Sequence, residues 1–140
     1  LSSSSAASDV YKRQIVYGRL PLMITENCLV QNETGCRLDR QGPCVPEDGP
    51  CRCGRSNVLV DRTGAAFPLL PAYGHRTEIQ NSRPLYLADR PEHRRLGLAY
   101  ARLRFTTETA EECVSVVQNH LDAAPAAGDF TRGLYERGVE

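Results

Sequence analysis

The residues most suited to chemistry are the cysteines. Five of them lie between positions 28 and 53, in the loop 26–56. They are Cys28, Cys36, Cys44, Cys51 and Cys53. Disulfides, idle thiols and metal ligation all use cysteine, but disulfides are commonest in small secreted domains without a core, and exposed idle thiols oxidise. Metal ligation fits this stretch best, because a metal can order a long polar loop that has no core of its own.

The spacing of the cysteines leaves the metal open. Zinc fingers usually carry two Cys-x-x-Cys pairs, whereas the tightest pair here is Cys51-x-Cys53, and Cys28 and Cys36 are far apart. An iron–sulfur cluster and a closed zinc site are therefore both compatible with the thiols.

The elements around this loop alternate between strand and helix patterns. Residues 15–24 are expected to form a mostly buried strand with an irregular position at Pro21. A hairpin is expected over 57–70, with Gly64 supplying a positive φ at its turn. Further strands are expected over 76–81 and 96–105, and a helix over 107–122 with a capping box between Thr109 and Glu112.

The expected helix carries an apolar stripe at helical spacing. The stripe consists of Ala110, Cys113, Val114, Val117 and Leu121. We predict Cys113 to be a small core residue, because buried cysteine packs as a hydrophobe. His120 lies off the stripe and His93 lies in a charged run, so both are predicted to be solvated.

Hydrolytic chemistry has weaker signals. A cysteine peptidase needs a thiolate beside a base, for which Cys28 and His75 are the conceivable pair, and the chain contains no His-Glu-x-x-His motif. Glu26, Asp61, Glu78 and Asp89 are candidate carboxylates without a spacing that pairs them. Arg62, Arg76, Arg83 and Arg90 are candidates for binding a phosphate or carboxylate, with solvated surface arginines as the simpler interpretation.

The ends and the composition add little about function. Residues 1–14, LSSSSAASDVYKRQ, resemble translated sequencing-adapter sequence, and we treat them as a non-native or disordered leader. The 17 basic residues balance the 17 acidic residues, which gives no overall charge to attract nucleic acid or anionic lipid. Within residues 15–140 no apolar run approaches the roughly 20 residues of a membrane span, so we expect no membrane partner for this part. As a separate expectation, the location is cytoplasmic.

Several segments together resemble the collagenase-like peptidase family U32. The resemblance rests on GRLPLMITENC (18–28), Cys36, Cys53, LVDRTGAAFPL (59–69), RTEIQNSRPLYL (76–87), ARLRFTTE (101–108) and FTRGLYERGVE (130–140). It covers residues 15–140 and implies an α/β fold, the C-terminal part of a (β/α) barrel with a cysteine-rich loop and a β-hairpin insertion. The remainder of the barrel would then lie upstream, and the fragment alone would be inactive.

The resemblance implies two kinds of activity. The family name rests on proteolysis, which makes the chain nominally part of a peptidase acting on peptides. Other members are implicated in oxygen-independent hydroxylation of RNA bases or a small aromatic, and several hold a [4Fe-4S] cluster. A third alternative is a zinc-stabilised interaction module without catalysis.

The resemblance also implies a ligand set for the cluster. Cys28, Cys36 and Cys53 lie where three of the four cysteine ligands are found in the family, and His75 stands at the fourth position. Either His75 binds through an imidazole nitrogen, or Cys44 or Cys51 supplies the fourth ligand, or the cluster is lost in this chain.

Overall fold

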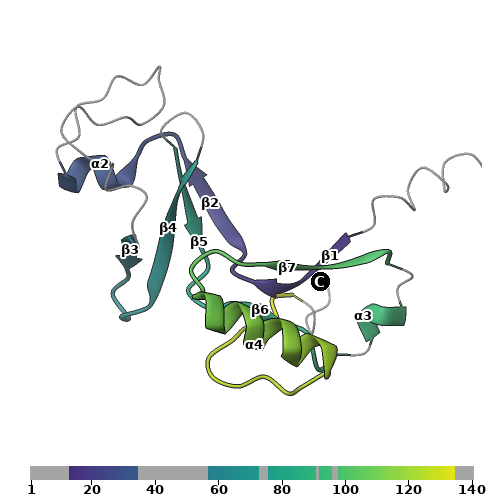
Figure 1. The fold of residues 1–140 in the computed structure, drawn as a ribbon. Helices are drawn as coiled ribbons and strands as arrows, with labels where there is room; N and C mark the ends of the chain where they lie inside the picture. Colours follow the sequence, from purple (N-terminus) through teal and green to yellow (C-terminus); the bar gives the residue numbers. More distant parts are fainter. Residues whose placement is uncertain (1–12, 35–56, 73–75, 91, 96–97, 135–140) are drawn as a thin grey trace, which may run out of the picture. The chain divides into compact units, whose positions relative to one another are not determined.

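The structure is a computed structural model that describes residues 13–34, 57–72, 76–90, 92–95 and 98–134 (Figure 1). The chain divides into two compact units. The terminal unit comprises Leu1–Arg19 and Arg83–Glu140, and the inserted unit comprises Leu20–Ser82. In the described ranges, seven strands form two sheets and three short segments are helical.

The terminal unit contains a three-stranded sheet in the order β6-β1-β7. The central strand β1 (Arg13–Gly18) runs antiparallel to β6 (Leu85–Tyr86) and parallel to β7 (Tyr100–Arg104). The helices of this unit are α3 (Glu92–Arg95) and α4 (Ala110–Leu121). Because β1 begins at Arg13, the last two residues of the leader 1–14 take part in this sheet, opposite Tyr100 and Ala101.

The core of the terminal unit is aromatic. Tyr17 of β1 and Tyr86 of β6 are buried, and their rings meet edge to face with centroids 6.5 Å apart. Val116 of α4 and Phe130 pack against this pair. The helix therefore covers the sheet through contacts to two tyrosine rings, a geometry in which aromatic pairs are favourable.

The segment after α4 returns to the sheet through backbone pairing. Thr131 forms a parallel bridge with Leu85, accepts a hydrogen bond from the Tyr86 N–H and donates its own N–H to the Pro84 carbonyl. These bonds satisfy backbone groups beside β6, so the segment around Thr131 acts as a further edge of the sheet.

The inserted unit is an antiparallel sheet of four strands in the order β2-β5-β4-β3. The elements are β2 (Pro21–Thr25), α2 (Leu29–Thr34), β3 (Asn57–Val60), β4 (Ala66–Ala72) and β5 (Arg76–Gln80). Val30 of α2 packs on Leu69 and Ile79 to form the buried cluster of this unit. The helix α2 therefore covers part of one face of the sheet.

The predicted hairpin over 57–70 is confirmed as β3 and β4. Asp61 organises its turn, because one carboxylate oxygen accepts hydrogen bonds from the N–H groups of Thr63 and Ala65 and from the Thr63 hydroxyl. These bonds, led by that from the Thr63 side chain, lower the pKa of Asp61. Gly64 has a φ of 85°, the positive value predicted for the turn.

The predicted helix is confirmed as α4, and its N-terminus has the predicted capping box. The Thr109 hydroxyl accepts a hydrogen bond from the Glu112 N–H, and the Glu112 carboxylate accepts one from the Thr109 N–H. The apolar stripe is less buried than predicted, since Val114 and Leu121 are 70% and 71% exposed. Of the stripe, Cys113 alone is half-buried, and it shares its face of the helix with half-buried Val116 and His120.

The prediction of an α/β fold from a (β/α) barrel is wrong for the part of the chain that the structure describes. Only β1 and β7 pair in parallel, the other four strand pairs are antiparallel, and neither sheet closes on itself. A (β/α) barrel requires successive parallel strands, each followed by a helix. Here residues 57–80 form antiparallel strands joined by short connections, which leave no room for crossover helices.

The predicted strand over 15–24 is also wrong in its extent. The chain forms β1 and β2 instead, separated at Arg19 and Leu20, and the two strands belong to different sheets. A positive φ of 120° at Gly18 turns the backbone out of β1.

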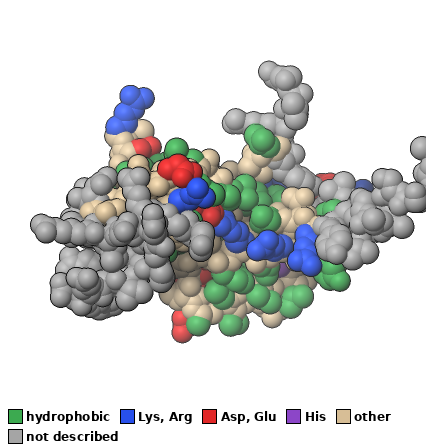
Figure 2. Space-filling view, turned by 90° about the horizontal axis from the view of Figure 1, so that it is seen from above, with side chains coloured by type: hydrophobic (Ala, Val, Ile, Leu, Met, Phe, Trp, Pro, Cys, Tyr) green, Lys and Arg blue, Asp and Glu red, His purple; other side chains and the backbone are tan. Residues whose placement is uncertain are grey.

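The predicted burial of β2 is wrong as well, because Leu22, Met23 and Ile24 are exposed at an edge of the sheet. The opposite edge strand, β3, exposes Val58, Leu59 and Val60. Figure 2 shows how much of the visible surface is hydrophobic. Both edge strands lack charged side chains, which commonly protect exposed sheet edges.

Replacement of Gly18 by alanine should severely destabilise the terminal unit. A Cβ at this position would lie 2.0 Å from the Arg104 carbonyl oxygen of β7, at a φ that side chains rarely adopt. The two effects together should cost about 3 kcal/mol or more. The measurement is urea denaturation of the full chain, followed through the amide signals of β1, β6 and β7.

Gly128→Ala is the matched control, because Gly128 has a φ of 82° in the same unit and an added Cβ would meet nothing within 4 Å. It should cost about 1–2 kcal/mol from the backbone conformation alone. Equal losses for the two variants would mean that the close approach to Arg104 is unimportant.

Candidate functional site

Cys28 is the one member of the predicted ligand set within the described residues, and it lies between β2 and α2. Its side chain is half-buried and packs against the cluster of Val30, Leu69 and Ile79. The start of the cysteine-rich segment is therefore attached to the core of the inserted unit.

Two hydrogen bonds, one of them to β5, fix the backbone on either side of Cys28. The Leu29 N–H donates to the Thr77 hydroxyl at 3.1 Å, and the Thr25 hydroxyl donates to the Asn27 carbonyl at 2.6 Å. Thr77 is 2% exposed, so its hydroxyl is a buried and oriented acceptor. This bond connects the beginning of α2 to the strand that follows His75 in the sequence.

The strand directions bring the strand ends that flank the predicted ligand segments to one end of the sheet. Since each neighbouring pair is antiparallel, the C-terminal ends of β2 and β4 lie at the same end as the N-terminal ends of β5 and β3. Residues 26–56 connect β2 to β3, and residues 73–75 connect β4 to β5. The strand ends that flank these two segments therefore lie at this end, which we call the ligand end.

The remaining predicted ligands are Cys36, Cys44, Cys51, Cys53 and His75, and all lie outside the described residues. Among the described residues, no group of three or more His, Cys, Asp or Glu side chains has an arrangement that could hold a metal. His93 also has no described side chain, whereas Cys113 is half-buried and forms no disulfide.

Several of the candidate carboxylates and arginines form ion pairs or turn contacts. At the ligand end, Arg76 donates from Nε and Nη2 to one oxygen of Glu26 at 3.1 and 3.0 Å. This pair is exposed, as is Arg83 with Asp129, and such pairs contribute little to stability. Asp61 organises its turn, and Glu78 accepts a hydrogen bond from Gln80.

Arg62 and Arg90 complete the set of candidate arginines. Arg62 is exposed in the hairpin turn, as expected for a surface arginine, and Arg90 is half-buried.

Asp89 forms an ion pair with Arg132 in which the two side chains are only 23% and 16% exposed. Arg132 donates to its two carboxylate oxygens at 2.6 and 2.7 Å and also to the Tyr86 carbonyl at 2.6 Å. The hydrogen bond from Arg132 holds the pKa of Asp89 below its ordinary value. The pair connects the segment after Phe130 to the end of β6, which makes Asp89 a structural residue.

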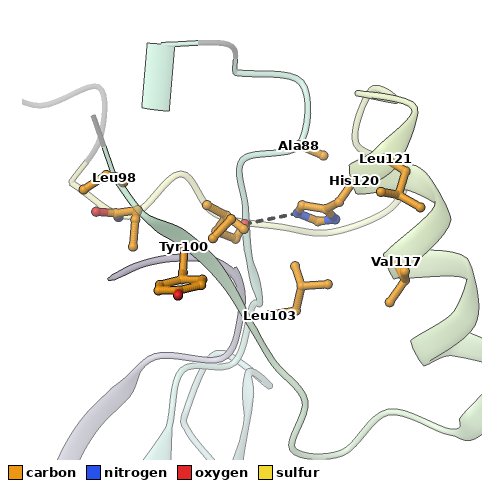
Figure 3. A pocket seen from close by; sticks show the side chains of 10 residues that line it. Ala88, Leu98, Tyr100, Leu103, Val117, His120 and Leu121 are labelled. Atoms are coloured by element: carbon orange, nitrogen blue, oxygen red, sulfur yellow. Dashed lines mark hydrogen bonds between the residues drawn. The ribbon is translucent and has the colours of Figure 1, made fainter. Parts of the chain in front are cut away.

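The prediction that His120 is solvated is wrong (Figure 3). The imidazole is half-buried and lies against Tyr17 and Tyr86, with ring centroids 5.8 and 5.2 Å away. The missed signal is the spacing of Cys113, Val116 and His120, which fall at i, i+3 and i+7 on one face of α4. Imidazole can serve as part of an aromatic core, so this helical face is less apolar than the predicted stripe.

Tyr17 and Glu108 form a second polar pair in the terminal unit, with the Tyr17 hydroxyl 3.2 Å from a Glu108 oxygen. Burial, reinforced by the carboxylate of Glu108, raises the pKa of Tyr17. Burial alone would raise the pKa of Glu108, but hydrogen bonds from backbone N–H groups, including Thr106 and Thr107, and from Tyr17 lower it overall. The pair is therefore a neutral phenol donating to a carboxylate at neutral pH.

Comparisons with known proteins do not assign the chain to a family. No protein-family model matches it, and neither the curated proteins nor the solved structures gave a match. The resemblance to family U32 remains a hypothesis that rests on the residues quoted above.

Replacement of Thr77 by valine should loosen the backbone beside Cys28. The substitution keeps the shape of the buried side chain but removes the acceptor for the Leu29 N–H, which should cost about 1 kcal/mol. We expect faster hydrogen exchange at the Leu29 amide in the full chain, with little change at the amides of β3. Thr77→Ser keeps the acceptor and should keep the protection, and equally fast exchange in both variants would contradict the role of the hydroxyl.

Replacement of Asp89 by asparagine should destabilise the terminal unit by about 1–2 kcal/mol at neutral pH, because Arg132 loses a charged acceptor. The folded-state pKa is lowered from 3.8, so the stabilisation is present above that value and is lost as the pH falls through the folded-state pKa. Urea denaturation over a pH series checks this. A difference between parent and variant that persists at acid pH would show that the charge of Asp89 is not responsible.

Proposed function

We propose that the ligand end of the inserted unit holds a cysteine-ligated metal cofactor, with a [4Fe-4S] cluster as the first choice and zinc as the alternative. Cys28, Cys36 and Cys53 would supply three ligands. His75 would supply the fourth, with Cys44 or Cys51 as its alternates.

The meeting of the strand ends carries this proposal. A metal centre needs ligands from separate stretches of chain to reach one point. The antiparallel order β2-β5-β4-β3 brings together the ends that lead into 26–56 and 73–75, although these segments are far apart in sequence. If the neighbouring strands ran parallel, each of these two segments would have to cross from one end of the sheet to the other.

The described residue of the set fits such a centre. Cys28 is held between a strand and a helix, half-buried against an apolar cluster, and its neighbour Leu29 is bonded to Thr77. Apolar packing beside a thiolate ligand limits solvent access, which is one of the factors that set the properties of a metal site. A bound cluster would supply one-electron transfer, and the chain would supply its ligands and their surroundings.

In functional terms, the proposal favours an iron–sulfur redox protein, as in the hydroxylating members of family U32, with RNA or a small aromatic as the substrate. A cysteine peptidase is the second candidate, because the ligand end also brings the chain ends leading to Cys28 and His75 together. Five clustered cysteines favour ligation over a single nucleophile. A cofactor of this kind agrees with a cytoplasmic location, where thiols stay reduced.

The proposal does not involve a membrane-spanning helix. Within the described residues, none of the helices has both the length and the hydrophobicity needed to cross a membrane.

Anaerobic expression of the full chain, followed by iron, sulfide and zinc analysis and an absorption spectrum, tests the proposal. We expect about four iron and four sulfide per chain and a broad charge-transfer band for a [4Fe-4S] cluster. Cys28→Ala should reduce the iron and sulfide content severalfold, because it removes one ligand.

Cys113→Ala is the matched control, since Cys113 is the one cysteine outside the loop and lies in the other unit. It should leave the metal content unchanged. Stoichiometric zinc would support the zinc site in place of the [4Fe-4S] cluster. A metal-free chain, or equal metal loss in both variants, would contradict the proposal, and peptide cleavage by metal-free protein would favour the peptidase.

A further inference from the structure

The inserted unit has two different sheet edges, and only the edge at β2 carries features that protect against further pairing. β2 begins with Pro21, and its register with β5 shifts before Met23; proline and register shifts both commonly protect edge strands. β3 contains no proline and no charged side chain, and it pairs with β4 in a continuous register. In Figure 1 it is the outermost described strand of its sheet. β3 is therefore the edge suited to accept another strand.

The register with β4 determines which backbone groups of β3 face its open side. In an antiparallel pair of strands, hydrogen-bonded pairs of residues alternate with pairs that exchange no hydrogen bonds. The Asp61 N–H donates to the Ala65 carbonyl at 3.1 Å, which fixes the phase of this alternation at the end of β3. Two residues earlier, Leu59 is again in a hydrogen-bonded pair, so its N–H and C=O face β4.

Val58 and Val60 take the alternate positions, so their N–H and C=O groups face away from β4. The residue opposite Val58 is Pro68, which has no N–H and could not complete a hydrogen-bonded pair. The side chains of Val58 and Val60 are exposed. These two residues therefore present their backbone donors and acceptors on the side of β3 opposite β4.

Two copies of β3 match this pattern when they pair antiparallel about Leu59. In that register Val58 of each copy is opposite Val60 of the other copy. Both of these pairs can exchange their two hydrogen bonds, so every outward N–H and C=O of Val58 and Val60 gains a partner. Leu59 meets its counterpart in a pair without hydrogen bonds, the type in which side chains lie closest.

The side chains are also compatible in this register. Leu59 lies on the same face of the sheet as Phe67, its partner in β4, and Phe67 packs against the buried cluster beside α2. Contact between two Leu59 side chains would extend that apolar face across both copies. Asp61, the first charged residue after β3, would be opposite Asn57 of the second copy, which is neutral. The register therefore places no like charges opposite each other, an arrangement that would destabilise the pairing.

We infer that β3 is an interaction surface for a second copy of this chain, and that antiparallel pairing of the two β3 strands joins two inserted units into one continuous sheet. Because each copy contributes the same edge, the pairing closes at a dimer. A strand of four residues gives a small interface, so the Kd should be about 10–100 μM. None of the proposed metal ligands lies in β3, so this interaction is separate from the proposed metal site.

Sedimentation equilibrium of the full chain, at concentrations on both sides of this Kd, tests the dimer. A reducing agent is included so that the cysteines do not cross-link the copies. We expect monomer at low concentration and dimer at high concentration, with no larger species.

Hydrogen exchange on the same samples tests the pairing. The Val58 and Val60 amides should exchange about tenfold more slowly where dimer outnumbers monomer tenfold. The Leu59 amide, which already faces β4, should change little.

Leu59→Lys should weaken the dimer at least tenfold, because it places two positive charges opposite each other at the centre of the pairing. Met23→Lys is the matched control. It introduces the same charge at an exposed apolar position of the other edge strand, so the Kd should stay unchanged.

Four results would each overturn the inference: a chain that stays monomeric, species larger than the dimer, association that is unchanged in Leu59→Lys or weakened equally in Met23→Lys, and equal protection of the Val58, Leu59 and Val60 amides. The exchange pattern is measured on the unmodified chain. It therefore decides the matter even if Leu59→Lys fails to fold.

Discussion

The terminal unit depends on the close approach of two backbones at Gly18. Here β1 ends with a φ of 120°, and the position of an added Cβ is occupied by the Arg104 carbonyl oxygen of β7. Arg104 also donates from its guanidinium to the Arg19 carbonyl at 2.7 Å, directly after the turn. Because β1 is the central strand of this sheet, a shift at Gly18 would disturb its pairing with β7 and, through Tyr17, with β6.

The aromatic packing follows from that pairing. Tyr17 is next to Gly18, and the register places it opposite Tyr86 on one side and Leu103 on the other. Its ring and that of Tyr86 form the surface on which Val116 and His120 of α4 pack. The position of the imidazole is thus determined by the sheet, although His120 is far from β1 in sequence.

The sequence predicts well where short-range chemistry decides the structure. The hairpin around Gly64 and the capping box of Thr109 and Glu112 each depend on residues within a few positions, and both are confirmed. Burial depends on partners distant in sequence, and there the predictions failed. Periodicity identified α4 as a helix, but its half-buried face includes His120 because the opposing surface is made of tyrosine rings.

The prediction of the fold class failed for a related reason. Strand and helix patterns that alternate along a chain are typical of parallel βαβ units, and the family resemblance pointed the same way. The deciding feature is the direction of pairing, which depends on the short connections between β3, β4 and β5 and on the break at Gly18. For the candidate site, the sequence identified the cysteines, whereas the strand directions at the ligand end emerged only with the sheet order.

The proposed metal site would depend on the metal itself for part of its order. At the ligand end the described structure supplies directions and one anchored cysteine, so a metal would contribute its own binding energy to ordering the ligands. Metal binding in the inserted unit should therefore depend strongly on each ligand.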